Sequence, residues 1–178
     1  MLLDLIRKRQ SVRSYLPKAI PRDEIEICLE AARLAPSACN SQPWRFIVID
    51  DPKIKNKLCD SIFNGPYSIN SFARSAPVFI VVVSEKASFL TRMGGNIRGT
   101  AYYLMDVAIA TQHFVLQAAE LGIGTCWIGW FNESETKKII GIPKDKKLDC
   151  IIAMGYSQDR LREKNRKSLG EISSYNKY

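Results

Sequence analysis

The sequence predicts an α+β domain built in layers. Segments with the helical repeat of apolar residues are mixed with short apolar, β-branched segments typical of strands, and the two kinds do not alternate in a strict βαβ order. No internal repeat, low-complexity segment or linker rich in Pro, Gly or Ser interrupts the 178 residues. We therefore expect a single domain over residues 1–178.

The first half of the chain predicts two helices, a strand and a third helix. Residues 2–9 form a short opening helix. Pro21 begins a second helix with acidic residues in its first turn, and this helix stops before Pro36. The next two elements are a strand and a helix, over residues 45–49 and 52–62.

The second half contains the most apolar elements. The continuous run 77–83 predicts a strand buried on both faces. The longest helix, 100–121, ends at Gly122 and is apolar nearly all round, so it must be covered on most sides, which suggests a large subunit interface. Its His113 is expected to be a buried, hydrogen-bonded residue. The remaining elements are strands over residues 125–131 and 148–154, a short helix over 133–140 and an extended C-terminal arm over 155–178.

Composition narrows the class of protein. Hydrophobic residues make up 46% and charged residues 25%, as in ordinary globular proteins. The opening residues do not resemble a secretory signal, and the run 77–83 is too short to cross a bilayer, so we expect a cytoplasmic protein without membrane association. Five scattered cysteines and a single histidine argue against a disulfide framework, a metal site and a Ser-His-Asp triad.

The net charge of +8 lies at the two ends of the chain. Residues 1–22 carry six bases and one acid, residues 160–178 carry six bases and two acids, and the middle carries fourteen bases and fifteen acids. Such ends are often simply solvated. Alternatively, they converge on one anion such as a phosphate, or present a basic face to nucleic acid.

Two glycine-containing segments do not qualify as nucleotide loops. Residues 122–124 follow a helix and precede a strand, the reverse of the order in a dinucleotide-binding fold. Residues 94–99 lack the Lys-Ser/Thr of a P-loop. We interpret both as turns, so NAD(P)H would not be held in a dinucleotide fold.

Three other segments combine chemistry with an unusual composition. Residues 7–13 offer arginines and a hydroxyl suited to a phosphate, or form an ordinary basic helix end. In 35–44, two prolines bracket small and amide side chains, which suits a flat, polar-edged ring or simply connects helix to strand. Glycines in 122–131 indicate either close approach by a ligand, or a bulge with tryptophans in the core.

Together these segments resemble the FMN-dependent nitroreductase family, over nearly the whole chain. Its Arg-x-Ser-x-Arg/Lys, Pro-Ser-x-x-Asn-x-Gln-Pro-Trp, Gly-x-Gly-x-x-Trp-x-Gly and Lys-x-Arg motifs are matched, in order, by residues 9–13, 36–44, 122–129 and 164–166. The resemblance implies a three-layer α-β-α sandwich with a mixed or antiparallel central sheet. It also implies an intertwined homodimer with FMN at the subunit interface.

The resemblance assigns the basic ends to the cofactor. Arg9, Lys164 and Arg166 would hold the FMN phosphate. Ser11 and Arg13 would reach the ribityl chain and the pyrimidine edge of the flavin. The positive charge at both ends of the chain would then have a common purpose.

The other two motifs would surround the ring, and no side chain is expected to be catalytic. Backbone around Trp127, Ile128 and Gly129 would face the isoalloxazine, with an N–H near the flavin N5. The loop residues that would line the ring and ribityl site, some from the partner subunit, are Pro36, Ser37, Asn40 and Gln42.

Some positions depart from the family pattern and leave the acceptor open. Gln10, counted here with the cofactor-binding residues, stands where many members have Arg or His, and Lys8 could rebuild the phosphate site. Ile128 stands where nitroaromatic reductases carry an acidic residue. The segment 84–99 is compact where substrate-covering insertions often occur, and the region 64–70 is a candidate for covering the flavin.

The resemblance implies an enzyme that passes hydride from NAD(P)H through FMN to a small oxidised acceptor such as a nitroaromatic or quinone. Alternatives on the same scaffold are a dehalogenase, a flavin-fragmenting enzyme, an azoline oxidase and a flavin-storing or sensing protein. A basic nucleic-acid-binding protein is a further alternative, although no strand interleaves aromatic and basic residues. We expect no nucleic-acid partner.

Overall fold

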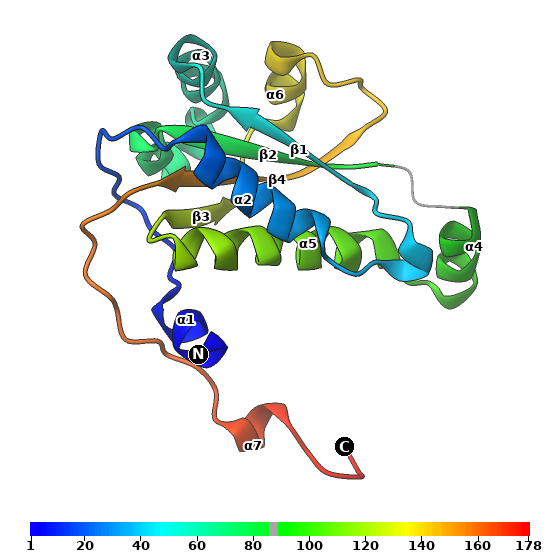
Figure 1. Cartoon of the computed structure of the whole chain (residues 1–178). Helices are drawn as coiled ribbons and strands as arrows, with labels where there is room; N and C mark the ends of the chain where they lie inside the picture. Colours follow the sequence, from blue (N-terminus) through cyan, green and yellow to red (C-terminus); the bar gives the residue numbers. More distant parts are fainter. Residues whose placement is uncertain (86–88) are drawn as a thin grey trace.

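The computed structural model describes residues 1–85 and 89–178 and has three layers (Figure 1). The antiparallel central sheet has the strand order β1-β2-β4-β3, with β1 (Trp44–Ile49), β2 (Val78–Ser84), β4 (Lys147–Gly155) and β3 (Gly124–Ile128). Helices α2 (Arg22–Arg33) and α5 (Tyr102–Glu120) cover one face, and α3 (Pro52–Ile62) and α6 (Glu133–Ile140) cover the other. The predicted α+β layered fold is therefore confirmed.

Strand β2 lies at the centre of the core. Its side chains alternate between the two faces of the sheet, so that Phe79 and Val81 join the apolar cluster on one side and Ile80 and Val82 join the cluster on the other. All of its residues are buried. The prediction of a strand buried on both faces is correct.

Helix α5 ends as predicted, with Gly122 in the left-handed conformation at φ +74°. His113 is partly buried, and its Nδ1 lies 3.3 Å from the carbonyl oxygen of Ala31 on α2. Within one chain, however, only part of α5 is covered, because Met105 and Ile109 on its outer side are exposed.

Some element boundaries differ from the predictions. Strand β3 ends at Ile128 rather than at residue 131, because its pairing with β4 stops at Ile128, although Phe131 beyond it is buried in the core. Part of the predicted turn 94–99 is helical, in α4 (Phe89–Arg98), which ends where Gly99 adopts φ +66°. Elements that were not predicted are α4, α7 (Leu169–Ile172), η1 (Ala38–Asn40) and η2 (Gly65–Ser75). Residues 86–88 of the compact segment 84–99 lie outside the described residues.

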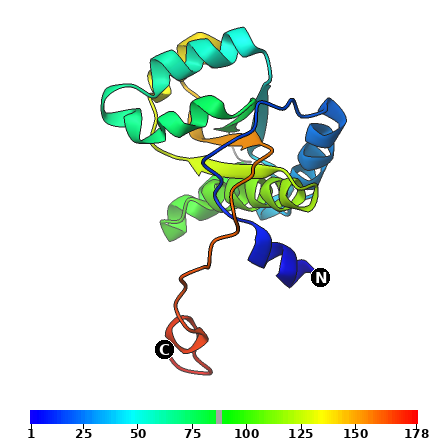
Figure 2. The same cartoon turned by 90° about the vertical axis from the view of Figure 1, so that its left-hand side faces the viewer.

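The opening helix α1 (Leu2–Lys8) and the C-terminal arm project from the same side of the molecule (Figures 1 and 2). Neither α1 nor α7 contains a buried residue, and apolar side chains such as Ile6 and Ile172 are exposed. In the described ranges, no helix has both the length and the apolar character needed to cross a membrane. The extended arm was predicted, and its short helix was not.

Candidate functional site

Basic residues from the two ends of the chain meet beside α1. Arg9 follows the last turn of α1, and the Lys164 ammonium donates a hydrogen bond to the carbonyl oxygen of Arg7. Partial burial, followed by the positive charges of Arg9 and Arg166, lowers the pKa of Lys164. We call Arg9, Lys164 and Arg166 the basic cluster. A cluster of like charges held in place in this way is suited to an anion such as a phosphate.

The segment after α1 lies along strand β3. Ser11 pairs with Thr125 in a parallel bridge, and the N–H of Val12 donates to the Thr125 carbonyl oxygen at 3.0 Å. A Cβ on Gly124 would lie only 2.6 Å from a Val12 methyl carbon. Gly124 therefore makes room for Val12, so packing within the chain accounts for this glycine. The contacts with Thr125 hold Ser11 against β3.

Arg13 is held by two residues that the sequence analysis did not single out. Its backbone N–H donates to an Asp159 carboxylate oxygen at 3.3 Å, and its guanidinium carbon lies 5.8 Å from the centre of the Phe72 ring. The signal for Asp159 was available, since it is an acid next to the basic C-terminal segment. Phe72 had no such signal, because only the fold brings η2 to Arg13.

The segment after β3 is fixed to η2. The Trp130 indole donates to the Pro66 carbonyl oxygen at 2.9 Å, and the Asn70 amide donates to the Trp130 carbonyl oxygen at 2.7 Å. The Tyr67 ring lies 5.3 Å from the Trp130 ring. Trp130 is 58% exposed and Trp127 is 38% exposed, so the interpretation of these tryptophans as core residues is wrong. The region 64–70 instead forms a wall beside the end of β3.

The end of β3 is open where the sequence analysis placed the flavin ring. Ile128 is 1% exposed, so its side chain belongs to the core and its backbone alone can face a ligand. No atom lies within 4 Å of the position that a Cβ on Gly129 would occupy. This space at the end of β3 could receive a flat group.

Loop 36–44 is strained and internally hydrogen-bonded. Cys39, Asn40 and Gln42 adopt φ values of +50°, +51° and +44°, a region that residues other than glycine rarely occupy. The Gln42 N–H donates to the Ser37 hydroxyl oxygen at 3.0 Å, and the Gln42 amide donates to the Asn40 side-chain oxygen at 3.1 Å. Pro36 is exposed at the start of the loop. Three of the predicted ring-lining residues therefore form one preorganised unit.

A buried acid on α5 anchors this loop. One carboxylate oxygen of Asp106 accepts the Ala38 N–H at 3.0 Å, and the Thr91 hydroxyl donates to the Ala38 carbonyl oxygen at 3.2 Å. Asp106 is 5% exposed, and its second oxygen, like the Ser41 hydroxyl, is buried without a hydrogen-bond partner. The sequence analysis missed Asp106, although it is the single acid between residues 102 and 119 of an apolar helix.

The structure brings the predicted site residues together in two groups, not one. Loop 36–44 contacts α5 at Asp106, near the N-terminal end of the helix, whereas β3 follows its C-terminal end (Figure 1). Ala118, whose carbonyl oxygen accepts the Ile123 N–H, lies about 18 Å farther along the helix axis at 1.5 Å per residue. Within one chain, the loop and the basic cluster therefore lie at opposite ends of α5.

Gln10 contacts the C-terminal arm. Its amide nitrogen donates to the Arg160 carbonyl oxygen at 3.1 Å, and its amide oxygen accepts the Arg162 N–H at 3.1 Å. Both ends of the side-chain amide are therefore used by the arm. Gln10 directly follows Arg9 of the basic cluster in the sequence.

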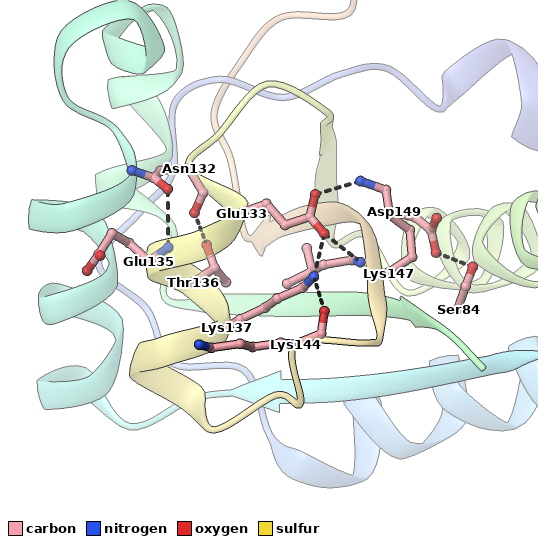
Figure 3. A network of polar contacts seen from close by, with 10 residues as sticks. Ser84, Asn132, Glu133, Glu135, Thr136, Lys137, Lys144, Lys147 and Asp149 are labelled. Atoms are coloured by element: carbon pink, nitrogen blue, oxygen red, sulfur yellow. Dashed lines mark hydrogen bonds and ion pairs between the residues drawn. The ribbon is translucent and has the colours of Figure 1, made fainter. Parts of the chain in front are cut away.

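A second polar network lies on the opposite side of the sheet, around α6 (Figure 3). The Glu133 carboxylate pairs with Lys137 at 2.8 Å and Lys147 at 2.5 Å, and it accepts the Leu148 N–H at 3.2 Å. Partial burial alone would raise the pKa of Glu133, but these hydrogen bonds outweigh it and lower the pKa to about 2. This network fixes α6 to β4 and is separate from the candidate site.

The cysteines offer no metal centre or disulfide in the described part of the chain. All five are free thiols, and burial raises the pKa of Cys126 beside Ser11. No group of three or more His, Cys, Asp and Glu residues in the described ranges is placed to hold a metal ion.

Comparisons with known proteins identify the family of the chain. The model of the nitroreductase family matches residues 6–156. A protein of Archaeoglobus fulgidus, named as a candidate NADH dehydrogenase/NAD(P)H nitroreductase, is 31% identical over 88% of this chain and 86% of its own length. An iodotyrosine deiodinase of Thermotoga neapolitana is 26% identical, with 89% of this chain and 90% of that protein covered.

A solved structure is similar over almost the whole chain. The FMN-dependent nitroreductase of Clostridium difficile R20291 superposes with a TM-score of 0.75 and 25% identity, and 99% of each chain is covered. The fold, the order of the motifs and these comparisons agree, and the chain belongs to the nitroreductase family.

Proposed function

We propose that this protein is an FMN-dependent oxidoreductase that passes hydride from NAD(P)H to a small oxidised acceptor such as a nitroaromatic or a quinone. The basic cluster is the observation that carries the proposal. The Lys164 ammonium donates to the Arg7 carbonyl oxygen, partial burial and then the charges of Arg9 and Arg166 lower its pKa, and a phosphate dianion would offset the repulsion between these cations. The chain thus provides a phosphate site next to an open strand end.

The residues around that strand end fit the rest of FMN. The space beside Gly129 and the wall of Tyr67 and Trp130 suit a flat ring, and Ser11, which is bridged to β3 at Thr125, follows Arg9 of the basic cluster by two residues. When bound, FMN supplies the hydride chemistry. Arg13, held by Asp159 and Phe72, provides a positive charge that would stabilise negative charge on the reduced ring.

We further propose that the site is completed in a homodimer. The exposed outer side of α5 around Met105 and Ile109 is apolar, and a two-fold axis through it would pack two copies of the helix antiparallel. This arrangement places loop 36–44 of one chain near the basic cluster of the other. The exposed apolar side chains of α1 and the arm would be covered by the same partner.

The donor and the acceptor would use the same open face in turn. We find neither a dinucleotide-binding loop nor a P-loop in the sequence, so NAD(P)H would stack at the open strand end beside Gly129 rather than occupy a separate domain. The name of the Archaeoglobus relative supports NAD(P)H as the donor, and the Clostridium structure supports FMN. One open site for both substrates favours a broad range of acceptors.

Reductive dehalogenation is the second candidate function. It is favoured by the similarity to the Thermotoga deiodinase, which covers 89% of this chain, compared with 88% for the Archaeoglobus relative. The flavin-fragmenting and azoline-oxidising functions would use the same FMN site. Binding of nucleic acid is disfavoured, because basic residues from both ends gather in one compact cluster.

The test is an absorbance spectrum of the purified protein, followed by anaerobic addition of NADH or NADPH. We expect flavin bands that bleach with a reduced nicotinamide and return when a nitroaromatic or quinone is added. Bands that return with an iodinated phenol and not with those acceptors would favour the second candidate. A protein that takes up no added FMN would contradict the proposal.

A further inference from the structure

The side-chain amide of Gln10 makes two hydrogen bonds to the C-terminal arm that together fix its position. It donates to the Arg160 carbonyl oxygen and accepts the Arg162 N–H, both at 3.1 Å. The side-chain amide of Asn or Gln has an N–H donor and a C=O acceptor side by side, as the backbone of a neighbouring strand does. Gln10 therefore binds the arm in one register, much as an added strand would.

This register decides where the cationic side chains of the arm lie. Lys164 follows Arg162 by two residues, and its ammonium reaches the Arg7 carbonyl oxygen one turn before Gln10. Arg166 follows by another two residues and contributes, with Arg9, to lowering the Lys164 pKa. The arm thus runs antiparallel to residues 7–13, and the Gln10 contacts lie between those at Arg13 and at Arg7.

The charge balance explains why a neutral amide suits this position. The arm approaches a segment that already carries Arg7, Arg9 and Arg13, so its own bases are repelled. Asp159 offsets part of this repulsion by accepting the Arg13 N–H at 3.3 Å and pairing with Arg162 at 3.5 Å. An arginine at position 10 would add charge and could not accept the Arg162 N–H.

We propose that Gln10 is a positioning residue: its amide fixes the register of the C-terminal arm, so that Lys164 and Arg166 form the phosphate site with Arg9 before the cofactor arrives. This inference rests on the proposed function. In this proposal the Gln10 amide acts on cofactor binding through the positions of Lys164 and Arg166, and not through a direct contact with the cofactor. Preorganisation of this kind raises affinity by reducing the ordering that binding requires.

The test compares FMN with riboflavin, which lacks the phosphate. In the full-length protein, Gln10→Ala should weaken FMN binding about tenfold, the effect of losing hydrogen bonds that hold charged groups in place, and leave riboflavin binding unchanged. The same substitution should have no further effect in a Lys164→Ala/Arg166→Ala background. Gln158→Ala, at an exposed glutamine of the same arm, is the matched control and should leave FMN binding unchanged.

A second measurement follows the contact itself. Hydrogen exchange at the Arg162 amide of the flavin-free protein should become several-fold faster in Gln10→Ala and stay unchanged in Gln158→Ala. Unchanged exchange, or an equal loss of FMN and riboflavin affinity, would overturn the positioning role. A wild-type protein that binds neither flavin would instead contradict the proposed function, so the two failures are distinguishable.

Discussion

Lys164 on the C-terminal arm lies beside Arg9 at the end of α1, and partial burial together with the charge of that arginine lowers the pKa of the lysine. The two residues come from opposite ends of the sequence and repel one another. Their proximity is therefore maintained by other contacts, such as the hydrogen bond from Lys164 to the Arg7 carbonyl oxygen. A bound phosphate would convert this repulsion into shared attraction.

Replacing Lys164 with alanine should therefore weaken FMN binding by about 10- to 100-fold, the range for losing a charge-assisted hydrogen bond. Fluorescence titration with FMN and riboflavin measures this, and riboflavin affinity should not change. Because the pKa of Lys164 is lowered without ligand, FMN affinity should fall with rising pH earlier than an ordinary lysine would allow. The alanine variant should lose this part of the pH dependence, and an identical profile would contradict the assignment.

Asp106 should control loop 36–44 from α5. Asp106→Ala leaves the Ala38 N–H without its partner, so the free energy of unfolding should fall by about 1–3 kcal/mol, with weaker FMN binding. Asp106→Asn is the matched control, because its side-chain oxygen can still accept the Ala38 N–H, and its NH₂ replaces a buried oxygen that has no partner. Urea denaturation compares the two variants. Equal losses in both would show that the hydrogen bond to Ala38 is not what holds the loop.

The glycine that begins β3 and the glycine that follows it should respond differently to alanine. Gly124→Ala forces a Cβ to within 2.6 Å of Val12 and should destabilise the fold by about 1–3 kcal/mol. Gly129→Ala meets no atom within 4 Å, so it should cost less than about 1 kcal/mol in stability yet weaken flavin binding or slow reduction by NAD(P)H. Thermal unfolding and anaerobic stopped-flow separate the two effects. Normal flavin reduction in Gly129→Ala would place the ring elsewhere.

The network around Glu133 should make stability depend on acid pH. Its pKa is lowered from 4.5 to about 2 in the folded protein, so its contribution is present above pH 4.5 and is lost as the pH falls from there towards 2. Glu133→Gln should lower the free energy of unfolding by about 1–2 kcal/mol at pH 7, after allowance for partial exposure. The difference in the free energy of unfolding between Glu133→Gln and wild type should shrink as the pH falls from 4.5 towards 2. Glu135→Gln, on the same helix turn and more exposed, should change stability less.

Local patterns in the sequence predicted most of the fold. The helices at 52–62 and 133–140 have the predicted bounds, because the proline and acidic residues at their starts act within a few residues. The helix α4 was missed because its glycines favour turns. The predicted end of β3 was too late because Phe131, which lies beyond the strand, is apolar and buried like a strand residue. Packing, rather than local preference, decides both.

The site was predictable where charge or a motif marked it. The concentration of bases at the two ends offered convergence on one anion as an interpretation, and the basic cluster brings residues from both ends together. The contacts of Gln10 with Arg160 and Arg162 were not predictable, because 150 or more positions separate the partners and no local pattern encodes their register. Likewise, the separation of loop 36–44 from the basic cluster could not be predicted, because it depends on how α5 lies between them in the fold.

Mixing two variants of the chain would test most directly whether one flavin site is built from two chains. One variant carries Ser37→Ala and Gln42→Ala in the loop, and the other carries Arg9→Ala and Lys164→Ala in the basic cluster, so that each alone binds FMN poorly. If loop and cluster come from different subunits, every mixed dimer regains one intact site, and random mixing restores about one quarter of the wild-type flavin content. No recovery in mixed dimers that demonstrably form would contradict the shared site and place all of these residues around one chain's own flavin.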